Sequence, residues 1–401
     1  MALHTLGVLG QTAAALTYVV ITIIYSRSDS VAVAGKIAVS VGMSAAVFAV
    51  SHWALQANIM VKPETKAFCT EYFVLRFGFL CIACVSCLVA LQWLDIAWSI
   101  ALAVALMRCA DGVIDLVFGF DVVVFGVSAA WKKYAFAHVA KLLAIGIVGA
   151  ITHFYAADYL GASLATSAFV CVVGAIYLSR GYVRPKTITQ VSISRIRTLL
   201  NSARWLALAS ICSALIVSLP RILAAEMYSG TELGVIGVAL TVVGTFGLIF
   251  YTSWTRFARM LSATRTRAST VRSLAIEIFA WALVLAVLAL GVLPEATAYI
   301  FKIDSAEQIV EIRSTILAGV IFFSGMAFVN LYKVTTARWM EAVTYLIAAL
   351  CITVLSYCPG PLRNMPSLLV LGGILMFGIS IPALKMALLR VPDNLQRDCQ
   401  S

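Results

Sequence analysis

Long apolar stretches alternate with short polar gaps along almost the whole chain. A bilayer core takes roughly 20 apolar residues per spanning helix, and about twelve stretches have that length. They are predicted as helices over residues Ala2–Tyr25, Gly35–Ala57, Tyr72–Trp93, Ile96–Phe118, Tyr134–Ala157, Leu160–Leu178, Trp205–Ala225, Leu233–Trp254, Ser273–Leu293, Thr315–Leu331, Ala342–Cys358 and Ser367–Leu389. Little chain remains for a soluble domain. The pattern therefore predicts an all-α membrane protein with about 12 transmembrane helices.

Basic residues occupy every second gap between these stretches. Most of the 29 Lys and Arg residues, Lys141 among them, are placed on the cytoplasmic side if the N-terminus is cytoplasmic, whereas most acidic residues lie on the other side. Short cytoplasmic loops retain Lys and Arg. We therefore predict a multi-pass membrane protein with both termini cytoplasmic.

Composition agrees with this class. The chain is 62% hydrophobic and 12% charged, outside the range of soluble domains. Its net charge of +11 follows from the basic cytoplasmic gaps and their attraction to anionic lipids, and predicts no nucleic-acid partner. Cys81, Cys84 and Cys87 form a C-x-x-C-x-x-C run inside the third stretch, without a His or fourth thiolate nearby. We interpret them as helix-packing residues and predict no metal or cofactor.

The longest cytoplasmic connector, Ser179–Arg204, lies near the middle of the chain and is rich in arginine. Six predicted spans precede it and six follow, as in a parallel repeat. This gives an N-terminal six-helix bundle over residues 1–180, a cytoplasmic connector over 181–204, and a C-terminal six-helix bundle over 205–401 that ends in a short cytoplasmic tail. The longest external loop, Pro294–Ser314, has room for one small surface helix. Such short loops favour a transporter, channel or scaffold over an enzyme.

Charged residues inside a span are costly and tend to face a cavity. Arg108, Asp111 and Asp115 share one face of the fourth predicted helix. Two interpretations remain open. This face either lines a wet cavity, where Arg108 meets an anionic group, or Arg108 and Asp111 neutralise each other one helical turn apart.

Other polar residues within spans are weaker site candidates. Arg221 follows Pro220 in the seventh span and either faces the cavity or extends to the headgroups. Arg76 and Glu277 lie about one turn inside the cytoplasmic ends of their helices and are interpreted as interfacial.

The first span carries a polar stripe of Gln11, Tyr18, Thr22 and Tyr25, which either faces the lumen or forms a packing seam. We take Arg108, Arg221, Arg76, Gln11 and Tyr18 as candidate substrate contacts. The candidate coupling or Arg-supporting carboxylates are Asp111, Asp115 and Glu277.

Three parts of the chain resemble one transporter family. They are Leu6–Gln11 followed by Ser28-Asp29 and Gly35; Arg108–Gly112 with Asp115-Leu116 and Trp131–Lys133; and Arg204–Leu208 with Ile216–Leu223 and Glu232–Ala239. These residues resemble the Wzx-type flippases of O-antigen and other polysaccharide repeats. That family belongs to the multidrug/oligosaccharidyl-lipid/polysaccharide exporter superfamily. Pro220 stands where the family has an acid and Ile236 where it has a tyrosine, so no role that needs a carboxylate at position 220 carries over.

The resemblance implies a MATE-like fold of two six-helix bundles around a central cleft, in a protein of the bacterial inner membrane. It implies alternating-access flipping of a polyprenyl-pyrophosphate-linked oligosaccharide from the cytoplasmic to the outer leaflet, with other polysaccharide-assembly proteins as partners. Coupling to a proton or sodium gradient is compatible with the carboxylates. The alternatives are a cation-coupled small-molecule exporter of the same fold, or a membrane glycan polymerase.

Overall fold

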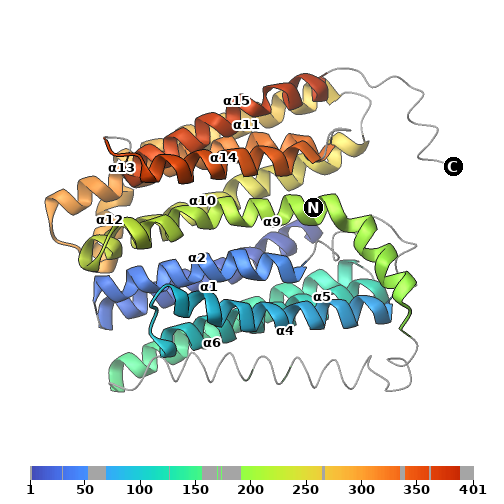
Figure 1. Ribbon diagram of the computed structural model, residues 1–401, viewed down its shortest axis with the longest axis horizontal. Coiled ribbons are helices and arrows are strands. Elements are labelled where there is room, and N and C mark those ends of the chain that lie inside the picture. Colours follow the sequence, from blue (N-terminus) through green and yellow to red (C-terminus); the bar gives the residue numbers. More distant parts are fainter. Residues whose placement is uncertain are drawn as a thin grey trace.

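The computed structural model describes residues 2–28, 30–52, 69–125, 127–155, 169, 173, 191–263, 267–334, 339–360 and 363–388. Helices account for nearly all of this chain (Figure 1). They are α1 (Ala2–Ser28), α2 (Val31–His52), α4 (Cys69–Trp93), α5 (Trp98–Phe125), α6 (Val127–Tyr155), α9 (Ile193–Met227), α10 (Gly230–Ala263), α11 (Arg267–Leu290), α12 (Val292–Phe301), α13 (Ala306–Val329), the 3-10 helix η2 (Asn330–Val334), α14 (Trp339–Tyr357) and α15 (Met365–Leu388).

The predicted spans coincide with these helices wherever the chain is described. The predicted span Leu160–Leu178, apart from residues 169 and 173, lies outside the described residues, as do residues 181–190 of the connector and the tail from residue 389. The external loop contains the small helix α12, for which the sequence left room, and its last residues belong to α13, which begins at Ala306 rather than at Thr315. Several other helices also extend beyond the predicted apolar spans. The largest difference is in α9, which begins at Ile193 rather than at Trp205, so the second part of the predicted connector is helical.

Helices form here because a bilayer offers no partners for backbone N–H and C=O groups. Polar side chains within the spans follow the same rule. The hydroxyls of Thr17, Thr22 and Thr241 donate to carbonyls four residues earlier in their own helices. α9 continues through Pro220, which has no N–H to donate.

The helices form two bundles, and α9 of the second bundle lies beside the first (Figure 1). In the first bundle α1 packs on α6, α2 on α4, and α5 on α4 and α6. In the second, α13 packs on α10, α11 and α15, while α14 packs on α15 and α9. The bundles meet where α2 contacts α9 and α10. The chain is thus an all-α membrane protein of two helical bundles.

Glycines let α2 and α10 approach closely at one end of this interface. A Cβ atom on Gly35 would lie 2.7 Å from the Cα of Gly234, and one on Gly237 would lie 2.8 Å from the Cα of Gly35. Only residues without side chains permit such an approach between helix backbones. Nearby, Ser26 of α1 donates to the carbonyl of Phe301 at the end of α12 over 2.9 Å.

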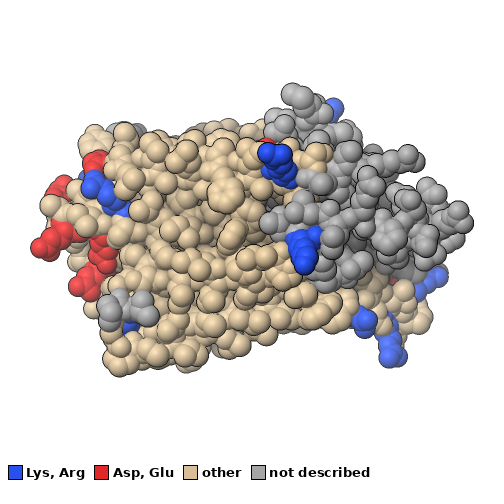
Figure 2. All heavy atoms as spheres, turned by 90° about the horizontal axis from the view of Figure 1, so that it is seen from above, with Lys and Arg blue, Asp and Glu red and all other residues tan. Residues whose placement is uncertain are grey.

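Charged side chains lie at the two ends of the molecule, with an uncharged belt between them, and acidic side chains gather at one end together with some basic ones (Figure 2). The acidic end carries exposed Glu226, Glu232, Glu295, Asp304 and Glu307. The basic end carries exposed Lys132, Lys133, Arg195, Arg197, Arg204, Arg272 and Lys385.

Large apolar side chains such as Val89, Leu283 and Val287 are exposed along the uncharged belt, as expected of lipid-facing positions. Among the described residues, eight helices are long and apolar enough to cross a membrane. The chain is therefore a multi-pass membrane protein.

Candidate functional site

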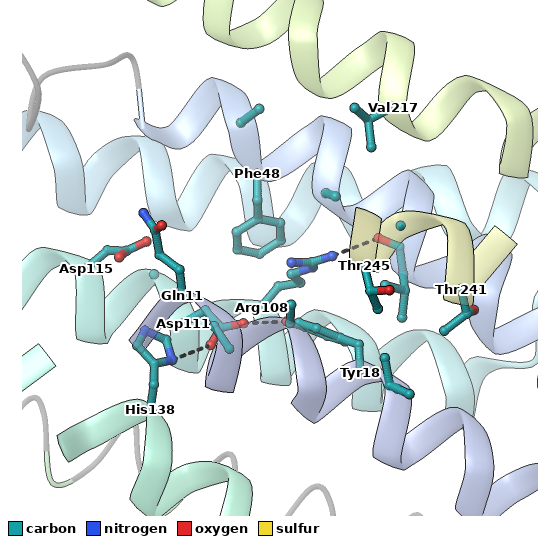
Figure 3. Close-up of a pocket in the computed structure, with 18 of the residues that line it drawn as sticks. Gln11, Tyr18, Phe48, Arg108, Asp111, Asp115, His138, Val217, Thr241 and Thr245 are labelled. Atoms are coloured by element: carbon teal, nitrogen blue, oxygen red, sulfur yellow. Dashed lines mark hydrogen bonds and ion pairs between the residues drawn. The ribbon is translucent and has the colours of Figure 1, made fainter. Parts of the chain in front are cut away.

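A cavity of about 390 Å³ lies between the two bundles. Helices α1, α2, α5 and α6 of the first bundle form one wall, and α9 and α10 form the other (Figure 3). Its polar and charged lining residues are Gln11, Tyr18, Thr22, Arg108, Asp111, Asp115, Tyr134, His138, Ser210, Arg221, Thr241 and Thr245. The cavity therefore collects most of the polar groups that the sequence places at membrane depth.

Arg108 of α5 is fixed by contacts with two neighbouring helices. Its Nε donates to the hydroxyl of Ser44 over 3.0 Å, and its Nη2 donates to the carbonyl of Val41 over 2.9 Å. Its guanidinium carbon lies 4.1 Å from the centre of the Tyr18 ring, in cation–π contact. Neither hydrogen-bond acceptor is charged, so these contacts orient the guanidinium without neutralising it.

Asp111 lies one turn further along α5 and has different partners. It accepts hydrogen bonds from the Tyr18 hydroxyl and from Lys141 Nζ of α6, and His138 Nδ1 lies 3.6 Å from its Oδ1. The self-contained Arg108–Asp111 pair, one of the two interpretations of the sequence, is not formed. Lys141 provides the countercharge instead.

Asp115 continues the same face of α5. Its carboxylate lines the cavity and lies close to the Tyr134 hydroxyl and to the positive charge of Arg76. Arg76 itself is buried on α4 behind the cavity wall. Glu277 lies on α11 of the second bundle and is not part of the lining. The structure thus brings Asp111 and Asp115 into the cavity and leaves Arg76 and Glu277 out of it.

Arg221 enters the cavity from the opposite wall. Its Nη2 donates to the Leu240 carbonyl over 3.0 Å, and its buried Nε has no hydrogen-bond partner among the described residues. Gly42 and Gly244 make room for its side chain, because a Cβ on Gly42 would lie 2.7 Å from Arg221 Cδ and one on Gly244 2.6 Å from its Nη2. Arg221 and Arg108 are near enough to repel each other electrostatically. Two guanidinium groups from opposite bundles thus share one cavity.

The polar stripe of α1 faces the lumen rather than a packing seam. Gln11, Tyr18 and Thr22 all line the cavity (Figure 3 shows Gln11 and Tyr18), whereas the side chain of Tyr25 lies outside the described residues. Tyr18 contacts both charged groups of α5: its ring makes a cation–π contact with Arg108, and its hydroxyl donates a hydrogen bond to Asp111.

Sequence reasoning missed the contribution of α6. Lys141 was counted with the cytoplasmic basic residues, yet it is buried and paired with Asp111. His138 lies one turn earlier on the same face of α6 and also lines the cavity. The signal was the i, i+3 spacing of two basic residues inside the predicted span Tyr134–Ala157.

Among the described residues, no group of three or more His, Cys, Asp and Glu side chains is arranged to hold a metal ion. Cys81 is exposed on α4 and Cys87 is buried, so the C-x-x-C-x-x-C run does not converge on one point.

The fold is similar to that of solved transporter structures. One is described as the inward-facing conformation of a multidrug resistance MATE family transporter of the MOP superfamily. It is 11% identical, with a TM-score of 0.64, over 98% of this chain and 100% of that chain. A structure described as MATE in the bent conformation is 12% identical, with a TM-score of 0.59, over 100% of this chain and 96% of that chain.

A third structure is described as an outward-facing conformation of a multidrug resistance MATE family transporter of the MOP superfamily. It is 13% identical, with a TM-score of 0.57, over 98% of this chain and 95% of that chain. No protein-family model matches the sequence, and neither does any curated protein. The structural likeness shows the fold: a MATE-like pair of helical bundles around a central cleft.

Proposed function

We propose that this protein is a transporter, not an enzyme, that works by alternating access. The cavity lies at the interface of two bundles, and each bundle supplies one wall. Rocking of the bundles about this interface would expose the same cavity to each side of the membrane in turn. The fold likeness to proteins described as inward-facing and outward-facing transporters supports this mechanism.

The substrate we propose is a polyprenyl-pyrophosphate-linked oligosaccharide, moved from the cytoplasmic to the outer leaflet of a bacterial inner membrane. The observation that carries this proposal is the pair Arg108 and Arg221, which approach one cavity from opposite bundles. Guanidinium groups form strong charge-assisted hydrogen bonds with phosphate oxygens. The Nε of Arg221 has no hydrogen-bond partner among the described residues, and because it is buried here it could donate to a substrate only after the side chain moves. The polyprenyl tail would remain in the lipid between the bundles.

The remaining polar lining fits a sugar headgroup. Gln11, Thr241 and Thr245 offer hydrogen-bonding groups on both walls, and Tyr18 and Tyr134 offer aromatic faces. A proton or sodium gradient would drive the cycle through Asp111 or Asp115, and polysaccharide-assembly proteins would deliver and consume the substrate.

The test is surface polysaccharide in the native host carrying Arg108→Ala at unchanged protein level. We expect polysaccharide to fall by about tenfold or more, because a charge-assisted contact contributes roughly 1.5–3 kcal/mol. Arg204→Ala is a matched control: Arg204 is exposed at the basic end and, like Arg108, lies over an aromatic ring, that of Trp205. Undiminished polysaccharide in the Arg108→Ala strain would exclude Arg108 from substrate contact.

A second candidate is a cation-coupled exporter of small molecules. The observation that favours it is the cavity volume of about 390 Å³, with apolar side chains such as Phe48 and Val217 among the lining residues. This size suits a drug-sized ligand. A deletion strain with unchanged polysaccharide and increased drug sensitivity would favour this candidate over the flippase.

A further inference from the structure

Asp111 forms an ion pair with Lys141, although another basic residue, Arg108, is closer to it in the sequence. Arg108 lies three residues earlier on α5, at the spacing where opposite charges on a helix normally pair. In the structure Asp111 Oδ1 instead accepts from Lys141 of α6, and Oδ2 accepts from the Tyr18 hydroxyl. Both carboxylate oxygens are therefore occupied by groups other than Arg108.

Lys141 is poorly placed for any role that needs solvent. It is 2% exposed and does not line the cavity. A buried ammonium group needs a countercharge, and Asp111 supplies it. Lys141 and Asp111 are neutral as a unit, so Asp111 compensates the charge of Arg108 less than a carboxylate without an ammonium partner would.

We propose that Lys141 is a positioning residue that keeps Asp111 from quenching Arg108, and so preserves Arg108 as the anion-binding group of the cavity. This rests on the proposed function, since it assigns a supporting residue to the same anion site. Tyr18 belongs to the same arrangement, because it holds Asp111 through its hydroxyl and Arg108 through its ring.

Removal of Lys141 has a definite electrostatic consequence. In Lys141→Met the carboxylate of Asp111 remains buried without its ammonium partner. His138 Nδ1 lies 3.6 Å from it, and Arg108 one turn away on α5 is the permanently charged group with which it can then pair. An ion pair between them competes directly with an incoming anion for the same guanidinium. A second change, Asp111→Asn in the Lys141→Met background, removes the competitor and frees Arg108 again.

The experiment measures binding of inorganic pyrophosphate to the purified full-length protein in nanodiscs by titration calorimetry. We expect Lys141→Met to weaken binding about tenfold or more, and Lys141→Met/Asp111→Asn to return it to within about threefold of wild type. Lys133→Met is the matched control, because Lys133 also joins α6 to α5 through an aspartate, Asp121, over 3.2 Å, but is exposed and outside the cavity. We expect it to bind as wild type does.

The double variant distinguishes two explanations for weaker pyrophosphate binding by Lys141→Met: pairing of Asp111 with Arg108, and loss of packing between α5 and α6. If Lys141 only held α5 and α6 together, the double variant would bind as weakly as Lys141→Met, and the proposal would be overturned. Unchanged binding by Lys141→Met, or no pyrophosphate binding by the wild type, would also overturn it. A failure of the proposed function would give a different result. The three proteins would still bind pyrophosphate as expected, but deletion of the gene would leave surface polysaccharide unchanged.

Discussion

The two walls of the cavity are built differently. The first bundle contributes a connected set of charged and aromatic groups, in which Arg108, Asp111, Lys141 and Tyr18 hold one another. Among the residues that line the cavity from the second bundle, only Arg221 is charged. The first wall is therefore preorganised around its cation. The second offers a single guanidinium with one described hydrogen bond, to the Leu240 carbonyl.

This difference suits a transporter whose bundles move. In the proposed transport cycle, a rigid site on one bundle would keep its geometry, while the cation on the other wall would approach or leave with its bundle. Repulsion between Arg108 and Arg221 would then oppose closure around an empty cavity, and an anion between them would remove it.

The largest difference between the walls is expected on replacement of each arginine by lysine. Arg108→Lys should weaken pyrophosphate binding roughly 100-fold, because lysine cannot reproduce the two hydrogen bonds or the stacked contact with Tyr18. Arg221→Lys should cost only about tenfold, since its one described hydrogen bond goes to the Leu240 carbonyl, which lysine can also reach. Titration calorimetry measures both. Equal losses would mean that the two walls are equally constrained.

The next effect concerns the glycines that accommodate Arg221. In Gly42→Ala the new Cβ meets the Cδ and Cβ of Arg221, which cannot move without α9, so we expect a stability loss of about 1–3 kcal/mol and weaker pyrophosphate binding. In Gly244→Ala it meets mainly the mobile Nη2, so binding should weaken with less than about 1 kcal/mol of lost stability. Thermal unfolding and calorimetry provide the two measurements.

Gly78→Ala is the control for both glycine variants. No atom lies within 4 Å of a Cβ built on Gly78, and alanine favours helix over glycine. Stability should be unchanged or slightly higher. A Gly42→Ala variant that behaves like Gly78→Ala would show that the wall around Arg221 is loose.

Much of this arrangement could be predicted from the sequence, because it depends on local patterns. Apolar length gave the spans, and helical periodicity placed Arg108, Asp111 and Asp115 on one face. The choice of partner could not be predicted in this way. Asp111 pairs with Lys141 thirty positions away rather than with Arg108 three away, and only the packing of α5 on α6 determines that.

Lys141 also shows why a charge count misleads inside a span. Counting it with the cytoplasmic basic residues satisfied the orientation rule, although its side chain is buried. The start of α9 at Ile193 was not predicted, for a related reason. Its first turns are polar and carry Arg195 and Arg197, which hydropathy assigns to a loop, although the helix continues beyond the apolar stretch.

The smallest effect tests whether the bundles separate at the acidic end. Ser26 donates to the Phe301 carbonyl across the two bundles, whereas Ser40 donates to the Lys36 carbonyl within α2. Both side chains are buried, and each hydrogen bond contributes about 1 kcal/mol. If α1 and α12 part during transport, Ser26→Ala removes a bond present in this conformation but absent from the other. It should therefore shift the conformational equilibrium about fivefold towards opening at the acidic end.

Ser40→Ala is the control, because it removes a hydrogen bond common to both states and should leave the equilibrium unchanged. Hydrogen exchange of the α12 amides in nanodiscs reads this difference, and equal protection in the two variants would mean that the contact between Ser26 and Phe301 persists through the cycle.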